Sequence, residues 1–376
     1  MRLENNAQLN NFDLLRFLAA IAVIFSHSFV LCTGHSDPLS ISSHGLFDFG
    51  GLAVATFFTI SGYLIAASYV RRNEIIYFFW ARILRIFPGL FVAVLFCVLI
   101  IGPLNTQLTI YNYFVDKQTL SYFLKNISLI HIHPWDFLPG TFVNNVYPNA
   151  VNGSLWTLPL ECVMYILLGI LGLLGVITNA KLKPLIFIMT LIGIYLLNFN
   201  HGVTIIPIHF LKDYLPSICC FMLGTIFFIY SNKIAINGKG LLLLTVLTGL
   251  MPHAYFICFF YATFSYCVLY FALNTFYMSA LFKKIGDMSY GLYIYAFPIQ
   301  QLLVHYFALE NAYILFLITV PITGIFAYMS WHLIEKKVLK LKSKKPSFSF
   351  LLPLAGEGKK IVKWYIPENG LNLYMS

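Results

Sequence analysis

Long apolar runs, separated by short polar stretches, dominate this chain between residues 13 and 334. A helix needs about 20 apolar residues to cross the roughly 30 Å hydrocarbon core of a bilayer. Ten runs approach this length, and each predicts a membrane-spanning helix: 13–31, 51–70, 84–103, 154–177, 184–199, 214–231, 236–251, 254–275, 289–309 and 312–334. The seventh run is the shortest, because Pro252 follows its apolar core directly, and we expect it to pair with the eighth in a tight hairpin. The predicted fold is an all-α, polytopic membrane bundle of about ten transmembrane helices.

The basic residues orient this predicted bundle. With the N-terminus on the cytoplasmic side, 20 of the 24 lysines and arginines fall in inner loops or after the last span. The outer side then holds only Lys117, Lys125 and Lys212, and Arg16 lies within a span. Because cytoplasmic loops carry the excess of Lys and Arg, we expect both termini to be cytoplasmic. The predicted domains are a membrane domain, 1–337, and a short basic cytoplasmic tail, 338–376.

One outer loop, 104–153, is much longer than the others and is rich in aromatic residues, Pro, Asn and Gly. It shows no clear element of its own, and long connections of this kind are usually functional or disordered. Its aromatic residues favour an ordered lid or binding loop. His131 and His133 alternate within it but lack a third ligand, so no metal site is expected.

Composition agrees with a membrane protein: 59% of the residues are hydrophobic and 10% are charged, against about 25% charged in soluble domains. The formal net charge of +10 sits between apolar runs, so it reflects topology, and no nucleic-acid partner is expected. The seven cysteines form no Cys-x-x-Cys pair and are interpreted as small core residues.

The first predicted span carries residues that are costly in hydrocarbon. Arg16 and His27 are eleven residues apart, so they project within about 20° of one direction, roughly 16 Å apart along the axis. Asp13 lies about 60° from Arg16 and is close enough to pair with it. A polar stripe in a span must face protein or water and predicts a functional site, and imidazole exchanges protons near neutral pH. The structural alternative is a snorkelling arginine and a histidine bonded to a neighbouring helix.

Two further polar features mark the second and third spans. Arg82 and Arg85 lie three residues apart, on one helical face at the cytoplasmic side. Two guanidinium groups there suit phosphate groups, although the topology signal and anionic lipid are alternative explanations. Ser61 and Gly62 interrupt the second span, which indicates either close helix packing through small residues or a chemical role.

Six short motifs occur in order along the chain: Arg-x10-His in the first span, FFTISGYLI in the second, WARILRIFP opening the third, NGSLWTLPLE before the fourth, MSYGLYIYAFP in the ninth and WHLIEKK closing the tenth. In this order they resemble the integral-membrane acyltransferase 3 family over about residues 10–337. The resemblance implies an O-acyltransferase of the bacterial cytoplasmic (inner) membrane. It would move an acyl group, usually acetyl, from cytoplasmic acetyl-CoA to a hydroxyl of a cell-surface polysaccharide, a lipopolysaccharide sugar or another acceptor.

The resemblance also implies roles for particular residues. Arg16 and His27 match the family's essential pair, with His27 as general base or transient acyl carrier and Arg16 holding donor phosphate or orienting the site. Arg82 and Arg85 match its donor-binding pair. Glu161 would bind acceptor hydroxyls or steady His27, although a carboxylate near the outer interface is the structural alternative.

We expect the substrate side to include Asn152, Trp156 and Ser61 as well. The chain departs from many relatives at Ala296, where they have a histidine. The role of that histidine is either absent here or taken by another residue, such as His305. A second departure is that only residues 336–376 follow Glu335, where many relatives carry an esterase-like domain, so we expect the single-domain form.

Rival functions use the same general architecture. A polyprenyl-linked glycan flippase would need similar spans and a basic inner face, but no acyl-CoA and no catalytic histidine. A small-molecule transporter would show inverted repeats with broken helices, and we find no internal repeat. A non-catalytic scaffold gives no reason for Arg16 and His27 to share one helical face.

Overall fold

The computed structural model describes residues 10–130, 137–199, 214–274 and 286–343. Within these ranges the chain forms helices and two isolated β-bridges, with no strand. The first half contains α1 (Phe12–Thr33), α2 (Pro38–Ser42), α3 (Phe49–Arg72), α4 (Ile75–Phe96), η1 (Cys97–Ile101), α5 (Gly102–Asn105), α6 (Ile110–Val115), α7 (Lys117–Ser128), η2 (Gly153–Trp156) and α8 (Thr157–Leu173). The second half contains α9 (Pro184–Phe199), α11 (Leu215–Ile229), α12 (Gly238–Leu250), α13 (His253–Leu273), α15 (Ser289–Phe307), α16 (Ala312–Ser330), η3 (Trp331–Glu335), α17 (Lys336–Leu339) and η4 (Lys340–Ser343).

Each of the ten apolar runs contains one main helix, and the all-α prediction is confirmed for the described residues. Six helical segments are long and apolar enough to cross a membrane, namely α1, α3, α4 with η1 and α5, η2 with α8, α13, and α16 with the segments that follow it. Three other apolar helices, α9, α11 and α12, are shorter. The count of ten spans therefore stays a prediction, and so does the cytoplasmic placement of the termini. Of the predicted tail, residues 344–376 lie outside the described ranges.

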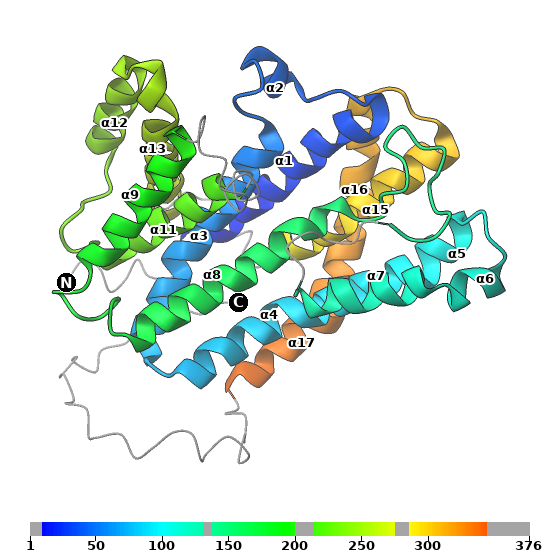
Figure 1. Cartoon of the computed structure of the whole chain (residues 1–376), viewed down its shortest axis with the longest axis horizontal. Coiled ribbons are helices and arrows are strands. Elements are labelled where there is room, and N and C mark those ends of the chain that lie inside the picture. Colours follow the sequence, from blue (N-terminus) through cyan, green and yellow to red (C-terminus); the bar gives the residue numbers. More distant parts are fainter. Residues whose placement is uncertain (1–9, 131–136, 200–213, 275–285, 344–376) are drawn as a thin grey trace.

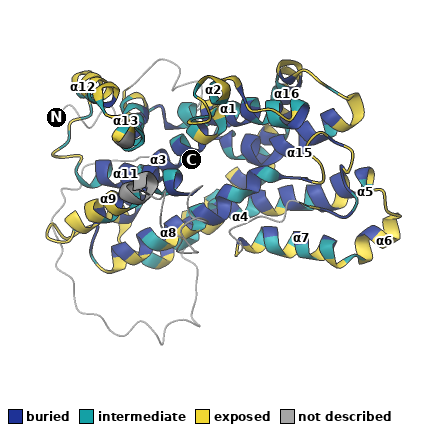
Figure 2. Ribbon diagram, turned by 45° about the horizontal axis from the view of Figure 1, so that its top comes forward, coloured by how far each residue is buried: buried dark blue, intermediate teal, exposed yellow. Residues whose placement is uncertain are grey.

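The helix α1 is held among three neighbours, since it packs against α3, α15 and α16 (Figure 1). On one side α3 packs closely against α11, and α9 and α13 also pack against α11. On the other side α4 contacts α8, α7 and η3. Figure 2 shows α15 largely buried and α1 and α3 as mixtures of buried and intermediate residues, whereas α12 and α6 are mostly exposed.

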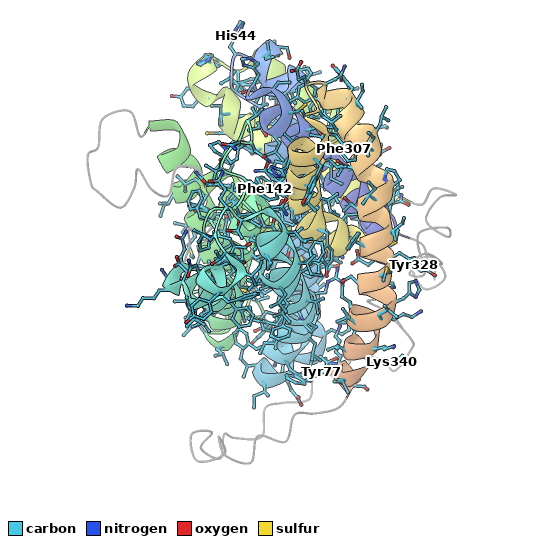
Figure 3. The ribbon with its side chains drawn as sticks, turned by 90° about the vertical axis from the view of Figure 1, so that its right-hand side faces the viewer. His44, Tyr77, Phe142, Phe307, Tyr328 and Lys340 are labelled. Carbon is cyan, nitrogen blue, oxygen red and sulfur yellow. The ribbon has the colours of Figure 1, made fainter. Side chains whose placement is uncertain are left out.

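The two ends of the bundle carry the residues that the topology prediction separates. In Figure 3, Tyr77 and Lys340 lie at one end of the molecule and His44 lies at the opposite end. Phe142 and Phe307, both predicted to be near the outer side, lie on the half nearer to His44. We refer below to the end with Tyr77 as the inner end and to the other as the outer end.

Local sequence signals set several helix ends. The Asp48 side chain accepts a hydrogen bond from the Gly51 N–H and caps α3, and Asn237 caps α12 through Gly240 in the same way. These caps satisfy backbone donors that have no partner within the helix. At the outer end of α1, Gly34 adopts a left-handed conformation with φ 71°, which glycine takes without steric cost.

The long outer loop has more structure than the sequence predicted. It forms α6 and α7, and α7 packs back along α4, where the Phe123 ring lies 6.2 Å from the Phe91 ring. The Tyr113 hydroxyl donates to the Val98 carbonyl at 2.9 Å, within the π-helical turn η1. The expected absence of an element in this loop was wrong. His131 and His133 lie outside the described residues.

Glycine allows a close helix contact between α3 and α11. A Cβ on Gly62 would meet the Phe221 carbonyl, and one on Gly224 would meet the Thr59 carbonyl. The Thr225 hydroxyl adds a hydrogen bond of 3.3 Å to the Gly62 carbonyl across the same contact. This observation favours the packing interpretation for Gly62, because small residues let helix backbones approach within a membrane.

Candidate functional site

Arg16 and His27 of α1 are both turned toward α15. Arg16 Nη1 lies 3.6 Å from Asp287 Oδ2, directly before α15, and the His27 ring lies 5.3 Å from the ring of Phe297 within α15. Arg16 Nη1 is also 3.9 Å from Asp13 Oδ1, so the predicted pair forms. The polar stripe of the first helix therefore faces protein, as the cost of exposing it to lipid requires.

The inner end of this stripe belongs to a network of ion pairs between four segments. Asp287 pairs with Arg16 of α1 and with Arg85 of α4, and Arg85 Nη1 lies 3.7 Å from Glu335 Oε2 of η3. Glu335 also accepts a hydrogen bond of 2.7 Å from Ser330. Burial favours the neutral acid at Asp287, but the guanidinium groups of Arg85 and Arg16 outweigh it and keep the pKa of Asp287 below its ordinary value.

Arg82 has different surroundings from Arg85, although the two residues are only three apart. Its guanidinium is buried over the Phe78 ring, 4.7 Å from the ring centroid, and its Nη1 donates to the Phe78 carbonyl at 3.4 Å. Its Nε has no hydrogen-bond partner among the described residues. The two guanidinium groups therefore have different contacts and do not form one equivalent pair.

Glu161 and Ser61 come together between α8 and α3. Tyr165 donates a hydrogen bond to Glu161, and the Ser61 hydroxyl donates to the same carboxylate oxygen at 3.4 Å. The Glu161 and Tyr165 groups also act electrostatically on Arg82. No contact joins Glu161 to His27 among those that the structure describes. Glu161 thus belongs to the arginine side of the site, toward the inner end.

The outer side of the site surrounds Phe297. Gly153 packs directly against the Phe297 ring, where a Cβ would lie 2.7 Å from Cε2. The adjacent Asn152 donates from Nδ2 to the Ile294 carbonyl at 2.9 Å. Trp156 lies further away, with its ring 5.5 Å from that of Tyr214. The turn that opens α8 therefore contacts the same aromatic ring as His27.

Several buried polar atoms in this outer part have no partner in the described ranges. They are the Nδ1 of half-buried His27, the Oδ1 of Asn152 and the Oγ of Ser154. Buried polar groups are nearly always hydrogen-bonded, so an unpaired group calls for an explanation such as a functional role. A free imidazole nitrogen is able to accept a proton from a hydroxyl that enters the site.

Two site residues were missed in the sequence. Asp287 lies directly before the ninth apolar run and close to Lys283 and Lys284, so it reads from the sequence as part of a charged loop. Tyr165 gave no signal, since an aromatic residue in a span reads as packing. His305 was considered as a substitute for the histidine absent at Ala296, and its Nδ1 lies 3.0 Å from Asn145 Oδ1 of the outer loop. It holds the loop and does not contact His27 within the described structure.

Among the described residues, no group of three or more His, Cys, Asp or Glu side chains could hold a metal ion.

Comparisons with known proteins add independent information. A family model described as an acyltransferase domain matches residues 9–332. An O-acetyl transferase of Shigella phage Sf6 is 28% identical over 357 residues, covering 90% of this chain and 98% of the relative. Nodulation protein 10 of Rhizobium leguminosarum bv. viciae is 29% identical over 365 residues, covering 90% and 96%. No solved structure matches the chain.

Proposed function

Because this chain belongs to the acyltransferase 3 family and is therefore an acyltransferase, we propose that it is an O-acetyltransferase that modifies the cell surface. The donor is acetyl-CoA from the cytoplasm, and the acceptor is a hydroxyl of a surface polysaccharide or lipopolysaccharide sugar. The name of the phage relative, O-acetyl transferase, supports both the acetyl group and the oxygen acceptor. The apolar helices and the bacterial and phage origin of the relatives support a place in the bacterial inner membrane.

One observation supports this proposal most directly: Arg16 and His27 share the face of α1 that contacts α15. Arg16 lies near the inner end with other cations, and His27 lies about 16 Å further toward the outer end. An anionic donor that arrives from the cytoplasm meets the arginines first. A polar acceptor from the outside meets the imidazole, whose Nδ1 is unpaired.

In the proposed donor site, Arg82 binds a phosphate of coenzyme A. Its Nε has no partner within the described chain and supplies a donor for a phosphate oxygen. Arg85 and Arg16 add positive potential and shape the inner end, although their nearest anions are protein carboxylates. Lys342 lies in η4, which packs against α4 and adds a cation at the inner end.

In the proposed reaction, His27 accepts the proton of the acceptor hydroxyl as its oxygen attacks the acetyl carbonyl. A carbon–oxygen bond forms, the carbon–sulfur bond of the thioester breaks, and the proton passes from imidazole to the departing coenzyme A sulfur. The alternative route has two steps, with the acetyl group resting on His27 before the hydroxyl takes it. Asn152 and Trp156 would line the acceptor side, while Ser61 and Glu161 would line the path of the acyl group between the two ends.

The central test is His27→Ala in envelope vesicles supplied with [14C]acetyl-CoA. Loss of a general base lowers the rate by about 10²- to 10⁴-fold, so we expect label in the glycan fraction to fall by at least that amount at equal protein level. His305→Ala is the control, because this exposed residue bonds only to the outer loop among the described contacts. Retention of normal transfer by the His27 variant would remove the proposed mechanism and favour a carrier function.

A further inference from the structure

The helix α15 contacts α1 at two levels, one near Arg16 and one near His27. Between them α15 contributes mainly apolar and small side chains to the interface. The polar contacts at the two levels are made by Asp287 and Gln300, and both side chains are completely buried. Neither residue is part of the proposed proton or acyl transfer itself.

At the inner level, Asp287 is fixed on several sides. Its carboxylate pairs with Arg16 and Arg85, and Ser289 donates to it from both its backbone N–H and its hydroxyl. The preceding Gly286 has φ 95° and lies against the Trp331 indole, where any Cβ would collide with Nε1. The turn before α15 is therefore built so that one carboxylate reaches two guanidinium groups.

At the outer level, Gln300 holds the turn of α1 that carries His27. Its Nε2 donates to the Ile24 carbonyl at 2.9 Å and to the Ser28 hydroxyl at 2.7 Å. Ser28 directly follows His27, and Ile24 lies one turn before it. Phe297, one turn before Gln300 on α15, meets the His27 ring itself. Two successive turns of α15 thus contact the His27 ring and the turn of α1 that carries it.

From these contacts we propose that α15 sets the geometry of the Arg16–His27 pair, with Asp287 as the positioning residue for Arg16 and Gln300 as the positioning residue for His27. The inference rests on the proposed function and assigns to α15 the alignment of its donor and acceptor ends. The two residues act through different partners, so they affect different kinetic constants. Asp287 governs how well the inner end binds donor, and Gln300 governs how often the imidazole is aligned for proton transfer.

The experiment compares purified variants of the full chain in lipid vesicles with envelope glycan and [14C]acetyl-CoA. Misplacement of a reacting group by about 1 Å costs on the order of 100-fold in rate. We therefore expect Gln300→Met to lower kcat by about 10- to 100-fold with little change in the KM for acetyl-CoA. The matched control is Gln301→Met, since this neighbouring glutamine is equally buried but donates to the Tyr147 and Ala150 carbonyls of the outer loop. It should lose comparable thermal stability while retaining more of kcat.

For the inner level, Asp287→Asn should raise the KM for acetyl-CoA. Asp287→Glu should bring the KM part of the way back to the wild-type value, because it keeps the negative charge on a longer side chain. Combined with Arg16→Gln, Asp287→Asn should add little further loss, because residues that act through one another are not additive. Multiplying effects, or a Gln300→Met variant no slower than the Gln301→Met control, would overturn the inference while the wild type stays active. A wild-type chain that transfers no label would instead overturn the proposed function, and the positioning roles with it.

Discussion

Two arginines on one helical face have different surroundings in this protein. Arg85 faces the carboxylates of Asp287 and Glu335, which neutralise it, whereas Arg82 is buried over an aromatic ring and forms no ion pair among the described contacts. A spacing of three residues places two side chains as neighbours but does not choose their partners. The partners of Arg85 come from the turn before α15 and from η3, about 200 residues or more away in the sequence.

This difference predicts separate phenotypes for the two arginines. Arg85→Ala leaves the buried Glu335 carboxylate without its cation and leaves Asp287 with Arg16 alone, and removing one partner of a buried pair costs about 3–5 kcal/mol. We expect a clearly lower melting temperature for that variant. Arg82→Ala removes a hydrogen bond to a charged ligand, worth about 1.5–3 kcal/mol, so it should keep its melting temperature better and raise the KM for acetyl-CoA by about 10- to 100-fold.

Thermal unfolding in detergent and donor titration of the same preparations check this prediction. Equal loss of stability in both variants, or an unchanged KM for the Arg82 variant, would show that the two side chains share one role. Arg82→Lys is a useful companion, since it keeps the charge and loses the planar guanidinium.

The Asp287 carboxylate also predicts a pH dependence. Its pKa is lowered in the folded protein, chiefly by Arg85 acting against burial, so it contributes stability above the ordinary value of about 3.9. That contribution is lost as the pH falls through the lower folded value. Relative to Asp287→Asn, the wild type should therefore be more stable at pH 5–7, and the difference should shrink below about pH 4. Scanning fluorimetry of both proteins over this range measures it, and a constant difference would contradict the assignment.

At the scale of elements, the contact between α3 and α11 depends on two glycines. Because a Cβ at Gly224 would overlap the Thr59 carbonyl, a larger side chain must push the helices apart, and overpacking costs about 1–3 kcal/mol or more. We expect Gly224→Leu to lower the melting temperature and the yield of folded protein. Gly249→Leu on the exposed α12 is the control, since nothing lies within 4 Å of its added Cβ.

Folded yield can be followed by size-exclusion chromatography after extraction in mild detergent. If the Gly224 variant behaves as the Gly249 variant does, the close approach of α3 and α11 does not limit stability. Activity is a second readout, because α3 also carries Ser61 toward Glu161.

The sequence located the elements better than it located their contacts. Ten apolar runs predicted ten helices because burial in lipid or protein demands long apolar segments. The helix α7 was missed because its lysines and polar residues lower the average hydropathy. Its apolar residues Leu120, Leu124 and Ile127 nevertheless recur at helical spacing. A count of apolar residues does not detect this periodicity.

For the candidate site, the sequence predicted the inward stripe, since Arg16 and His27 could not face lipid. The sequence did not pair Ser61 with Glu161, because the hydrogen bond between them depends on how α3 and α8 pack. Asp287 and Gln300 could not be assigned to α1 beforehand, because their partners lie more than 250 residues away. Long-range pairing of this kind needs the three-dimensional arrangement.

For the whole molecule, the sidedness of the bundle can be tested with single cysteines at its two ends. His44→Cys should react with a membrane-impermeant maleimide in intact cells, whereas Lys340→Cys should react only after the membrane is opened. The two positions lie at opposite ends of the molecule (Figure 3), and the native cysteines in the described ranges are buried or half-buried. The reverse labelling pattern would place the arginines on the wrong side for a cytoplasmic donor.

The unbroken course of α1 has one more consequence. From Phe12 to Thr33 this helix contains no proline. The number of residues between Arg16 and His27 therefore fixes both the distance along the helix axis and the angle around it between their side chains. Inserting one alanine there would rotate the imidazole by about 100° and carry it past the neighbouring helix. Inserting seven would nearly recover the direction but displace it by about 10 Å. Loops around the bundle can change in length without altering the distance and angle between Arg16 and His27, whereas the number of residues between them within α1 cannot change.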